Sequence, residues 1–513
     1  MTQSAHNETK IHWKWITLSV IAIANVWQSI KSSGLCHSVT ALVMMLLLRA
    51  ESSFAGQQAR RSADSPRRPN ILVLITDDQR FDMLRIANPL LHTPEMDRLA
   101  REGVRFINAF VTTPICAASR ASILTGMVER THRYTFLTPP LSRRFVEQCY
   151  PKVLRNAGYT TAYIGKLGVK LAAGTSPFDE IEELGPGQYW RLQPDGSSRH
   201  LTDIEGDKAM DFLERHARQH PDQPFCLTVG FNAPHADDPE PQQYFWQKEV
   251  DSLYRDVDVP MPPLTEPEFY QHLPEFLRDG TLNRRRWAWR FDFESKRQNM
   301  TKGYWRMISG IDLVIGRLRR KLADLKLADN TVIVLMSDNG YFLGERGYAD
   351  KWLPYEQSIR IPLVLFDPQG RLARPGLEPR QIALNIDIAP TVLDLAGVSV
   401  PSQMQGRSLL ALARGETPAD WRRDIWIEHL MMEPSIRKHE GVRTERYKYS
   451  RYFEAIPVLE ELYDLEEDSL ETVNLVNSPG HRELLDKLRK RTDELREQYG
   501  GEFNAAVWKR AQQ

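Results

Sequence analysis

NILVLITDD, residues 70–78, is a short, mostly apolar run that ends in two aspartates. Such a run, bounded by polar residues, is typical of a strand that is buried on both faces. Three later stretches have the same character: TTAYIGK (160–166), FCLTVGF (225–231) and TVIVLMSDNG (331–340). The sequence therefore predicts four buried strands with polar residues at their ends.

Amphipathic helices are predicted between these strands. TPEMDRLAREG (93–103) has helical spacing and a terminal glycine, and residues 304–325 carry apolar side chains at steps of three and four. Alternating helices and apolar strands indicate an α/β fold, with a large domain built on a central, mostly parallel sheet flanked by helices. Functional groups in such folds gather at the carboxyl ends of the strands.

The texture of the sequence changes in two places. Residues 236–300 are rich in proline, aromatic and charged residues and have weak periodicity, so we interpret them as an excursion within a catalytic domain of residues 70–400. From about residue 401, strand patterns (424–430 and 445–453) precede a helical pattern that ends on two glycines (482–501). We predict a smaller C-terminal α+β subdomain with an antiparallel sheet over residues 401–513.

Composition excludes some partners. The chain of 513 residues contains 42% hydrophobic and 26% charged residues, an ordinary balance for a soluble globular protein. Lys+Arg and Asp+Glu each number 67. Because there is no global basic field, no nucleic-acid partner is predicted.

Two apolar runs near the N-terminus, 15–27 and 38–48, are both shorter than the ~18 residues of a spanning helix. The second is followed by Ser53-Phe54-Ala55, which fits the small-x-small rule for signal-peptide cleavage. We predict a signal peptide with an N-terminal extension over residues 1–55, the first run arising from a misplaced start codon, and a linker over 56–69. The protein would then be periplasmic or secreted, without stable membrane insertion; an uncleaved anchor is the alternative.

Export would leave three cysteines, Cys116, Cys149 and Cys226, an odd number. Cys149 and Cys226 could pair, although nothing in the sequence requires it. An unpaired cysteine in an oxidising compartment is either buried or modified. Cys116, in TTPICAASRASILTG (112–126), is therefore either a buried small residue at the start of a helix or a reactive centre.

Acidic and amide side chains follow two of the predicted strands: Asp77 and Asp78 the first, Asp338 and Asn339 another. One such pair alone is more often a helix cap or a turn. Two pairs together supply the hard oxygen ligands that suit Ca²⁺ or Mg²⁺. His235 and Lys351 also follow strand-like runs and could supply positive charge and a proton to an anionic ester.

Several segments together resemble the type I sulfatases of the alkaline-phosphatase-like superfamily. CAASRASILTG (116–126) is similar to the Cys-x-Pro/Ala-x-Arg signature whose cysteine becomes formylglycine, and ILVLITDDQR (71–80) and VIVLMSDNGYFLGERG (332–347) resemble the two metal segments. Further resemblances lie in DKWLPYEQSIRIPLVLF (350–366), IDIAPTVLDLAGV (386–398), MQGRSLL (404–410) and ELYDLEEDSLETVNL (461–475). The resemblance covers about residues 69–500 and is nearest to sulfatases acting on iduronate and N-acetylglucosamine sulfates.

The resemblance implies a role for each matching position. The metal ligands would be Asp77, Asp78, Asp338, Asn339 and the modified Cys116. Arg120 would hold the formylglycine hydrate, and Lys166, in YIGKLG, would lie beside it. His235 and Lys351 would contact the sulfate and the leaving oxygen.

The sequence departs from the family pattern in three places. Ala118 stands where proline is commoner, which restricts the choice of maturation enzyme. GKLG (165–168) lacks the histidine of the usual Gly-Lys-Trp-His-Leu-Gly segment, so the group that helps to deprotonate the hydrate is unassigned. Arg346 replaces a common histidine and is expected to alter a substrate-side contact.

The resulting prediction is a sulfuric ester hydrolase that cleaves sulfate esters of carbohydrates with a formylglycine nucleophile and Ca²⁺, or alternatively Mg²⁺. Its partners would be a sulfated carbohydrate and a formylglycine-generating enzyme. Alternatives are a phosphonate monoester or phosphodiester hydrolase, a thiol hydrolase using Cys116 and His235, and a degenerate sulfatase that only binds sulfated glycans. Specificity is expected in residues 236–300 and in Glu428, His429 and Arg443, unless these three are salt-bridged or capping side chains.

Overall fold

The central element is a seven-stranded sheet, seen here in a computed structural model that describes residues 68–136, 139–238, 240–371 and 373–506. The sheet has the strand order β2-β12-β9-β1-β8-β4-β5. Its strands are β1 (Asn70–Thr76), β2 (Val104–Arg105), β4 (Thr160–Gly165), β5 (Glu180–Glu183), β8 (Phe225–Gly230), β9 (Thr331–Ser337) and β12 (Leu363–Phe366). The four predicted strands are its middle members.

Strand β1 lies between β8 and β9 and runs parallel to both. β4 is parallel to β8 and β5, whereas β12 is antiparallel to β9 and β2. All seven residues of β1 are buried. A parallel strand covered by helices on both faces reads as a continuous apolar run, which explains the sequence of this segment.

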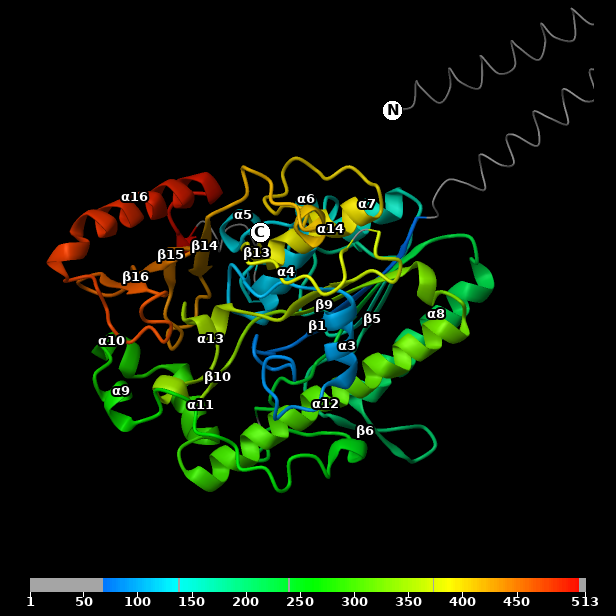
Figure 1. Cartoon of the computed structure of the whole chain (residues 1–513), viewed down its shortest axis with the longest axis horizontal. Coiled ribbons are helices and arrows are strands. Elements are labelled where there is room, and N and C mark those ends of the chain that lie inside the picture. The colour runs from blue at the N-terminus through cyan, green and yellow to red at the C-terminus, as the bar shows by residue number, and fades with distance from the viewer. Residues whose placement is uncertain (1–67, 137–138, 239, 372, 507–513) are drawn as a thin grey trace, which may run out of the picture. The chain divides into compact units, whose positions relative to one another are not determined.

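Helices cover both faces of the sheet (Figure 1). Leu72 and Leu74 of β1 share a core cluster with residues of α3 (Pro94–Glu102), α8 (Leu201–Gln219) and α12 (Glu294–Asp324). Ile71 and Val73 point to the other cluster, with residues of α4 (Cys116–Thr125), α7 (Tyr150–Asn156) and α14 (Ile388–Leu395). The α/β prediction is therefore confirmed.

The excursion is more helical than its sequence suggested. It contains η1 (Lys248–Val250), α9 (Pro267–Gln271), α10 (Glu275–Arg278) and α11 (Leu282–Arg290). Helix α12 begins at Glu294 rather than at residue 304, the predicted start. Short helices of three to nine residues carry too few turns for a clear period, which is why the pattern was weak.

A four-stranded antiparallel sheet follows, in the order β14 (Asp424–His429), β15 (His439–Thr444), β16 (Tyr447–Tyr452) and β17 (Leu459–Asp464). Helix α16 (Arg482–Tyr499) contacts it, as predicted. Ile427, Leu462 and Leu488 belong to the same core cluster as Ile71 and Val73. The small sheet is separate from the large one but shares its hydrophobic core, and a subdomain boundary near residue 400 stays a prediction.

The remaining elements are short. Paired strands are β3 (Ala109–Phe110) with β13 (Ala383–Leu384), β6 (Trp190–Leu192) with β7 (Ser198–His200), and β10 (Phe342–Leu343) with β11 (Ala349–Asp350). Short helices are α5 (Glu129–His132), α6 (Arg143–Val146), α13 (Glu356–Ile359), α15 (Leu410–Ala413), η2 (Ala328–Asn330), η3 (Glu345–Gly347), η4 (Asn385–Asp387) and η5 (Pro479–His481).

The predictions about export fall partly on residues outside the described ranges and partly on residues inside them. The predicted signal peptide (1–55) and nearly all of the linker (56–69) lie outside the described residues. Within the described ranges, no helix combines the length and apolarity that a membrane span needs. Cys149 and Cys226 do not pair, because both are free thiols buried in the core, as is Cys116.

Candidate active site

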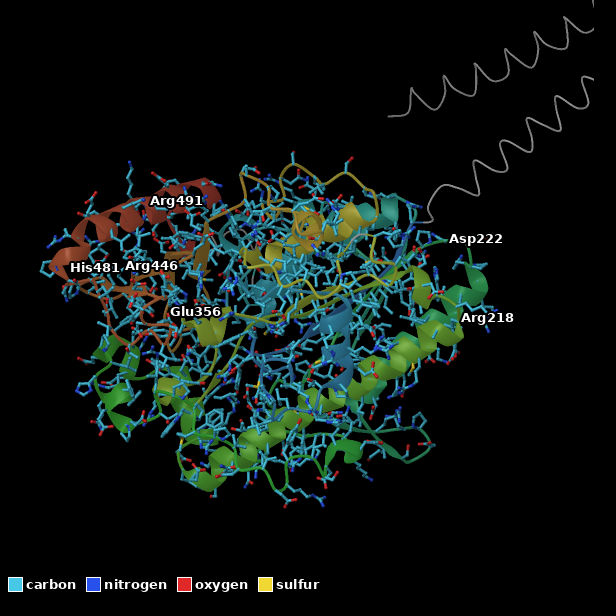
Figure 2. All side chains as sticks on the ribbon, viewed as in Figure 1. Arg218, Asp222, Glu356, Arg446, His481 and Arg491 are labelled. Atoms are coloured by element: carbon cyan, nitrogen blue, oxygen red, sulfur yellow. The ribbon has the colours of Figure 1, made fainter. Side chains whose placement is uncertain are left out.

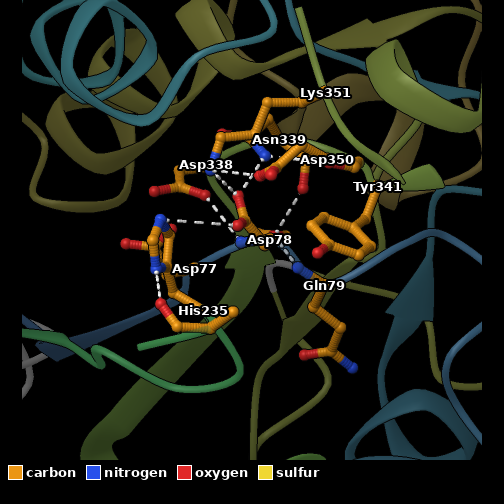
Figure 3. Close-up of polar contacts among 12 residues, drawn as sticks. Asp77, Asp78, Gln79, His235, Asp338, Asn339, Tyr341, Asp350 and Lys351 are labelled. Carbon is orange, nitrogen blue, oxygen red and sulfur yellow. Dashed lines mark hydrogen bonds and ion pairs between the residues drawn. The ribbon is translucent and has the colours of Figure 1, made fainter. Parts of the chain in front are cut away.

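The two predicted metal segments meet at the carboxyl ends of β1 and β9. Thr76 pairs with Ser337 at the end of the two strands, so that the residues that follow them emerge side by side. Asp77, Asp78, Asp338 and Asn339 are all buried, none more than 1% exposed. Figure 3 shows them around a common centre with His235 and Lys351.

The turn after β1 is held from several sides. Asp78 has a φ of 67°, in the left-handed region that an aspartate adopts only at a cost. Its amide donates to Asp338 Oδ1 at 3.1 Å, and its Oδ1 accepts from Asn339 Nδ2 at 2.7 Å and pairs with the ammonium of Lys351. The hydroxyl of Tyr304 donates to the carbonyl of Asp78 at 2.7 Å. These contacts fix the direction of the Asp78 carboxylate.

Cys116 and Arg120 lie one turn apart at the start of α4. Cys116 is the first residue of that helix and is 5% exposed. Arg120 donates through Nε to Asp338 Oδ2 at 2.7 Å and through Nη1 to the Tyr163 hydroxyl at 3.0 Å. Gly230 leaves room for this guanidinium, because a Cβ there would lie 2.8 Å from Arg120 Nη1. The prediction that Arg120 faces the pocket beside Cys116 is in keeping with this arrangement.

Three further predicted residues border the same centre. Lys166 follows β4 and pairs with Asp77 Oδ2. His235 follows β8, with its Nε2 3.7 Å from Asp78 Oδ2 and its Nδ1 2.6 Å from the Ala236 carbonyl oxygen. Because a carbonyl only accepts, Nδ1 carries the proton, and Nε2 of the neutral ring presents a lone pair to the site.

Burial and charge oppose one another in the pKa values of the site. Burial raises the pKa of Asp77, but Lys166, His235 and Arg120 outweigh it and hold that pKa well below its usual range. Burial raises the pKa of both Asp78 and Asp338 to about 6. Burial, with the nearby ammonium of Lys351, lowers the pKa of His235 to about 4. The positive charge around Asp78 and Asp338 is therefore too small to offset the cost of burying their carboxylates.

Three buried oxygens in the described part of the site have no hydrogen-bond partner: Asp77 Oδ1, Asp78 Oδ2 and Asn339 Oδ1. An unsatisfied buried oxygen is costly, and three around one centre indicate an ion. Ligand atoms of Asp77, Asp78 and His235 all lie within 4.8 Å of one another. The residues present fit a hard divalent cation, whose two charges would offset those of the buried carboxylates.

The residues that sequence reasoning assigned to substrate contacts have other partners. Glu428, which is completely buried, accepts from Arg130 Nε at 3.0 Å, and Arg443 pairs with Glu356 at 3.2 Å. The salt-bridge alternative is therefore the right one for both, and His429 is completely buried as well. Arg346 is 4% exposed and donates to the Glu471 carbonyl at 2.6 Å, so the predicted substrate-side contact is wrong.

Some residues at the site gave no usable signal in the sequence. Tyr304 lies in the middle of α12, and Asp350 precedes Lys351 and pairs with Arg286 and Arg290 of α11. A tyrosine on an amphipathic helix and arginines in a polar excursion look like ordinary core and surface residues. Only the fold brings them to the site.

The site joins a buried oxygen cluster to a cysteine at a helix N-terminus on an α/β sheet, which is the arrangement of a metal-dependent ester hydrolase. The sulfatase family model matches residues 69–398, and a model described as the C-terminal region of N-sulphoglucosamine sulphohydrolase matches residues 344–498. The chain belongs to the sulfatase family. The predicted fold and the sulfuric ester hydrolase class are thereby confirmed.

Relatives cover nearly the whole chain. N-acetylglucosamine-6-O-sulfatase of Bacteroides thetaiotaomicron is 28% identical over 95% of this chain and 94% of its own length. An arylsulfatase of Clostridium perfringens is 28% identical over 82% of this chain and 93% of its own length.

Solved structures share the fold. A protein in complex with its substrate D-glucosamine-2-N,6-O-disulfate aligns with a TM-score of 0.72 and 28% identity, over 84% of this chain and 98% of its own. Phosphonate monoester hydrolase from Silicibacter pomeroyi aligns with a TM-score of 0.71 and 21% identity, over 84% and 96%. At that identity the second likeness concerns the fold alone.

Proposed function

We propose that this protein hydrolyses sulfate esters of carbohydrates, with Cys116 converted to formylglycine as the nucleophile and a divalent cation bound by Asp77, Asp78, Asp338 and Asn339. The observation that carries the proposal is the placement of Cys116 at the start of α4, in electrostatic reach of Lys166 and Lys351 and of the Asp77 and Asp338 carboxylates. Near these groups, Asp77 Oδ1, Asp78 Oδ2 and Asn339 Oδ1 have no hydrogen-bond partner among the described residues and could bind the cation.

The carbohydrate substrate is supported by a relative and by a solved structure that each cover most of the chain. The relative is named as an N-acetylglucosamine-6-O-sulfatase, and the solved structure holds D-glucosamine-2-N,6-O-disulfate as its substrate. An amino sugar that carries sulfate on an oxygen is therefore the substrate class that we expect. Two further relatives are named as extracellular sulfatases, which fits our prediction of a periplasmic or secreted protein.

The chemistry follows from the two hydroxyls of a hydrated aldehyde. One loses its proton, which the free Nε2 lone pair of His235 can accept, and attacks sulfur; the bond to the sugar oxygen breaks as that oxygen takes a proton from Lys351. The second hydroxyl then loses its proton, the carbon–oxygen double bond reforms, and sulfate leaves. A serine or a thiol lacks this second hydroxyl and would stay sulfated.

Positive charge around the nucleophile stabilises the charge that develops on the sulfuryl oxygens. Arg120, Lys166 and Lys351 are all at most 7% exposed and are fixed by ion pairs, so they need no reorganisation during the reaction. The bound cation would add Lewis-acid polarisation of the sulfate. The oxygen-only ligand set favours Ca²⁺, with Mg²⁺ as the alternative.

The test is a measurement of Cys116 together with turnover. After co-expression with a formylglycine-generating enzyme, the peptide that contains Cys116 should weigh about 18 Da less than its unmodified form, because CH₂SH has become an aldehyde. Activity on glucosamine 6-O-sulfate should rise in proportion to the modified fraction, and Cys116→Ala should abolish it. A fully active preparation with an intact thiol, or faster turnover of a phosphonate monoester than of any sulfate ester, would contradict the proposal.

A further inference from the structure

We propose that helix α11, in the excursion of residues 236–300, is a positioning element for Lys351 and His235, the two residues assigned to the sulfate and the leaving oxygen. The inference rests on the proposed function and concerns Asn283, Arg286 and Arg290, none of which has been assigned a role so far. Arg290 is completely buried, and Asn283 is 2% exposed. Their spacing of three and seven residues places all three on one face of the helix.

Two of these side chains hold the backbone around Lys351. Asn283 Nδ2 donates to the Ala349 carbonyl at 3.0 Å and to the Lys351 carbonyl at 2.7 Å. Arg290 Nη1 donates to Asp350 Oδ2 at 2.7 Å. Lys351 is thus fixed at its own carbonyl and at the side chain of the residue before it.

The segment needs this support because its backbone is strained on both sides of Lys351. Asp350 has a φ of 72° and Trp352 a φ of 81°. Non-glycine residues in this region cost free energy and persist only where the surroundings hold them. Trp352 is held from the Cys116 side, where its amide donates to the Pro114 carbonyl at 3.1 Å. Asp350 is held by α11.

The same helix also fixes the loop that carries His235. Arg286 Nη1 lies 2.7 Å from Asp238 Oδ2, and Arg290 pairs with the same carboxylate. Arg290 Nε donates to Gln243 Oε1 at 2.7 Å, and Gln243 Nε2 donates back to the Asp238 carbonyl at 3.0 Å. One buried guanidinium therefore ties both loops together.

The four charges of this cluster balance, since Arg286 and Arg290 face Asp238 and Asp350. The hydrogen bonds and ion pairs given for the two guanidiniums go to those two carboxylates and to Gln243, and none joins them to the orphaned oxygens of Asp77, Asp78 and Asn339 in the described residues. We therefore assign α11 a positioning role and not a catalytic one. A shift of about 1 Å in a catalytic group can cost about a hundredfold in rate, which sets the expected effect.

The experiment compares two substrates that differ in their need for an acid. A sugar sulfate has a poor leaving group, whereas an activated aryl sulfate leaves without a proton. Arg290→Gln should lower kcat on the sugar sulfate about a hundredfold and on the aryl sulfate less than about tenfold, with KM nearly unchanged. Arg290→Lys should recover part of the loss. Arg285→Gln, which removes an exposed arginine from the same helix, is the matched control.

Asn283→Ala keeps the test valid if Arg290→Gln does not fold, because it removes two hydrogen bonds and no charge. It should show the same preference for the aryl sulfate. Equal losses on both substrates, in step with a lower melting temperature, would overturn the inference, as would variants that behave like Arg285→Gln. The proposed function fails separately, if parent enzyme with verified formylglycine turns over neither substrate.

Discussion

Two regions of this molecule bury charged side chains, and they do so in opposite ways. At the carboxyl ends of β1 and β9, the carboxylates of Asp77 and Asp78 each keep one oxygen that has no hydrogen-bond partner among the described residues. Beside the small sheet, Arg130 donates to both oxygens of Glu428, at 2.8 Å from its amide and 3.0 Å from Nε, and to Glu440 at 2.7 Å.

The remaining oxygen of Glu440 accepts from Arg451 at 2.6 Å. Arg130, Glu428, Glu440 and Arg451 are therefore paired with one another, although the buried Glu129 beside them has no hydrogen-bond partner in the described chain, whereas the carboxylates of the first region are incomplete. Breaking a buried ion pair is costly because it leaves one charge uncompensated, whereas several unpaired oxygens around one centre need an explanation, and a bound cation offers one in the first region. Burial alone does not distinguish a site from a structural network.

The same contrast separates residues that are close in sequence. Glu356 lies only five residues after Lys351, but it pairs with Arg443 of β15 and Lys448 of β16. Figure 2 marks Glu356 at α13, beside the small sheet. Lys351 belongs to the incomplete region, whereas Glu356 is paired with two cations of the small sheet, so their substitution should have different consequences.

The largest effect is expected where the oxygens are orphaned. Asp78→Asn preserves the shape of the side chain but removes the charge that a cation would bind. Turnover of a sulfate ester should fall about a thousandfold or more, and the bound metal measured by elemental analysis should fall with it. The melting temperature of the metal-free protein should fall as well, because Asp78 Oδ1 pairs with the buried ammonium of Lys351 and the asparagine removes that counter-charge. Unchanged metal content with activity within tenfold of the parent would contradict this.

A smaller effect, on stability rather than on activity, is expected where Arg130 pairs with Glu428. Glu428→Gln leaves Arg130 buried without its full counter-charge and should lower the free energy of unfolding by about 3–5 kcal/mol. The kcat/KM of the remaining folded protein should stay unchanged. Denaturant unfolding and active-site titration measure the two quantities, with Glu445→Gln on the exposed turn between β15 and β16 as control. A loss of kcat/KM without a loss of stability would place Glu428 in the site.

The smallest expected effect is on the decrease in stability at acidic pH. Burial lowers the pKa of His439 in β15 from its ordinary 6.5 to about 3. Between these values the unfolded chain binds a proton that the folded chain does not, so stability falls as the pH drops from about 6.5 towards 3. His439→Gln should make the decline in melting temperature over this range less steep. His272→Gln, which removes an exposed imidazole, is the matched control; equal slopes for both variants would refute the assignment.

Much of the fold and the core of the site could be predicted. The apolar run of β1 and the periodicity of α12 are local patterns, and parallel strands bring their carboxyl ends together without further information. Asp77, Asp78, Asp338 and Asn339 follow strands directly and were found for that reason. Ser337, Thr76 and the register between them then place these groups side by side.

The sequence left a residue's role open, or gave it wrongly, where that role depends on the residue's partner. Glu428 and Arg346 are charged residues, which are normally exposed. The sequence around them therefore gave no sign that each would be buried against another segment. Arg346 reaches the Glu471 carbonyl, 125 residues away, and Glu428 reaches Arg130 at a separation of 298. No periodicity encodes such pairs.

The sequence by itself determined the α/β sheet, the family and the residues at the ends of its strands, because hydrophobic periodicity and the residues next to strand ends are local properties. Only the tertiary structure decided which buried charges are closed and which are left open for a ligand. It also placed Asn283 and Arg290 of α11 against Lys351, although the excursion that contains them has no clear pattern. The physical reason is that hydrogen-bond satisfaction is a property of pairs, and the partners are chosen by packing over long separations.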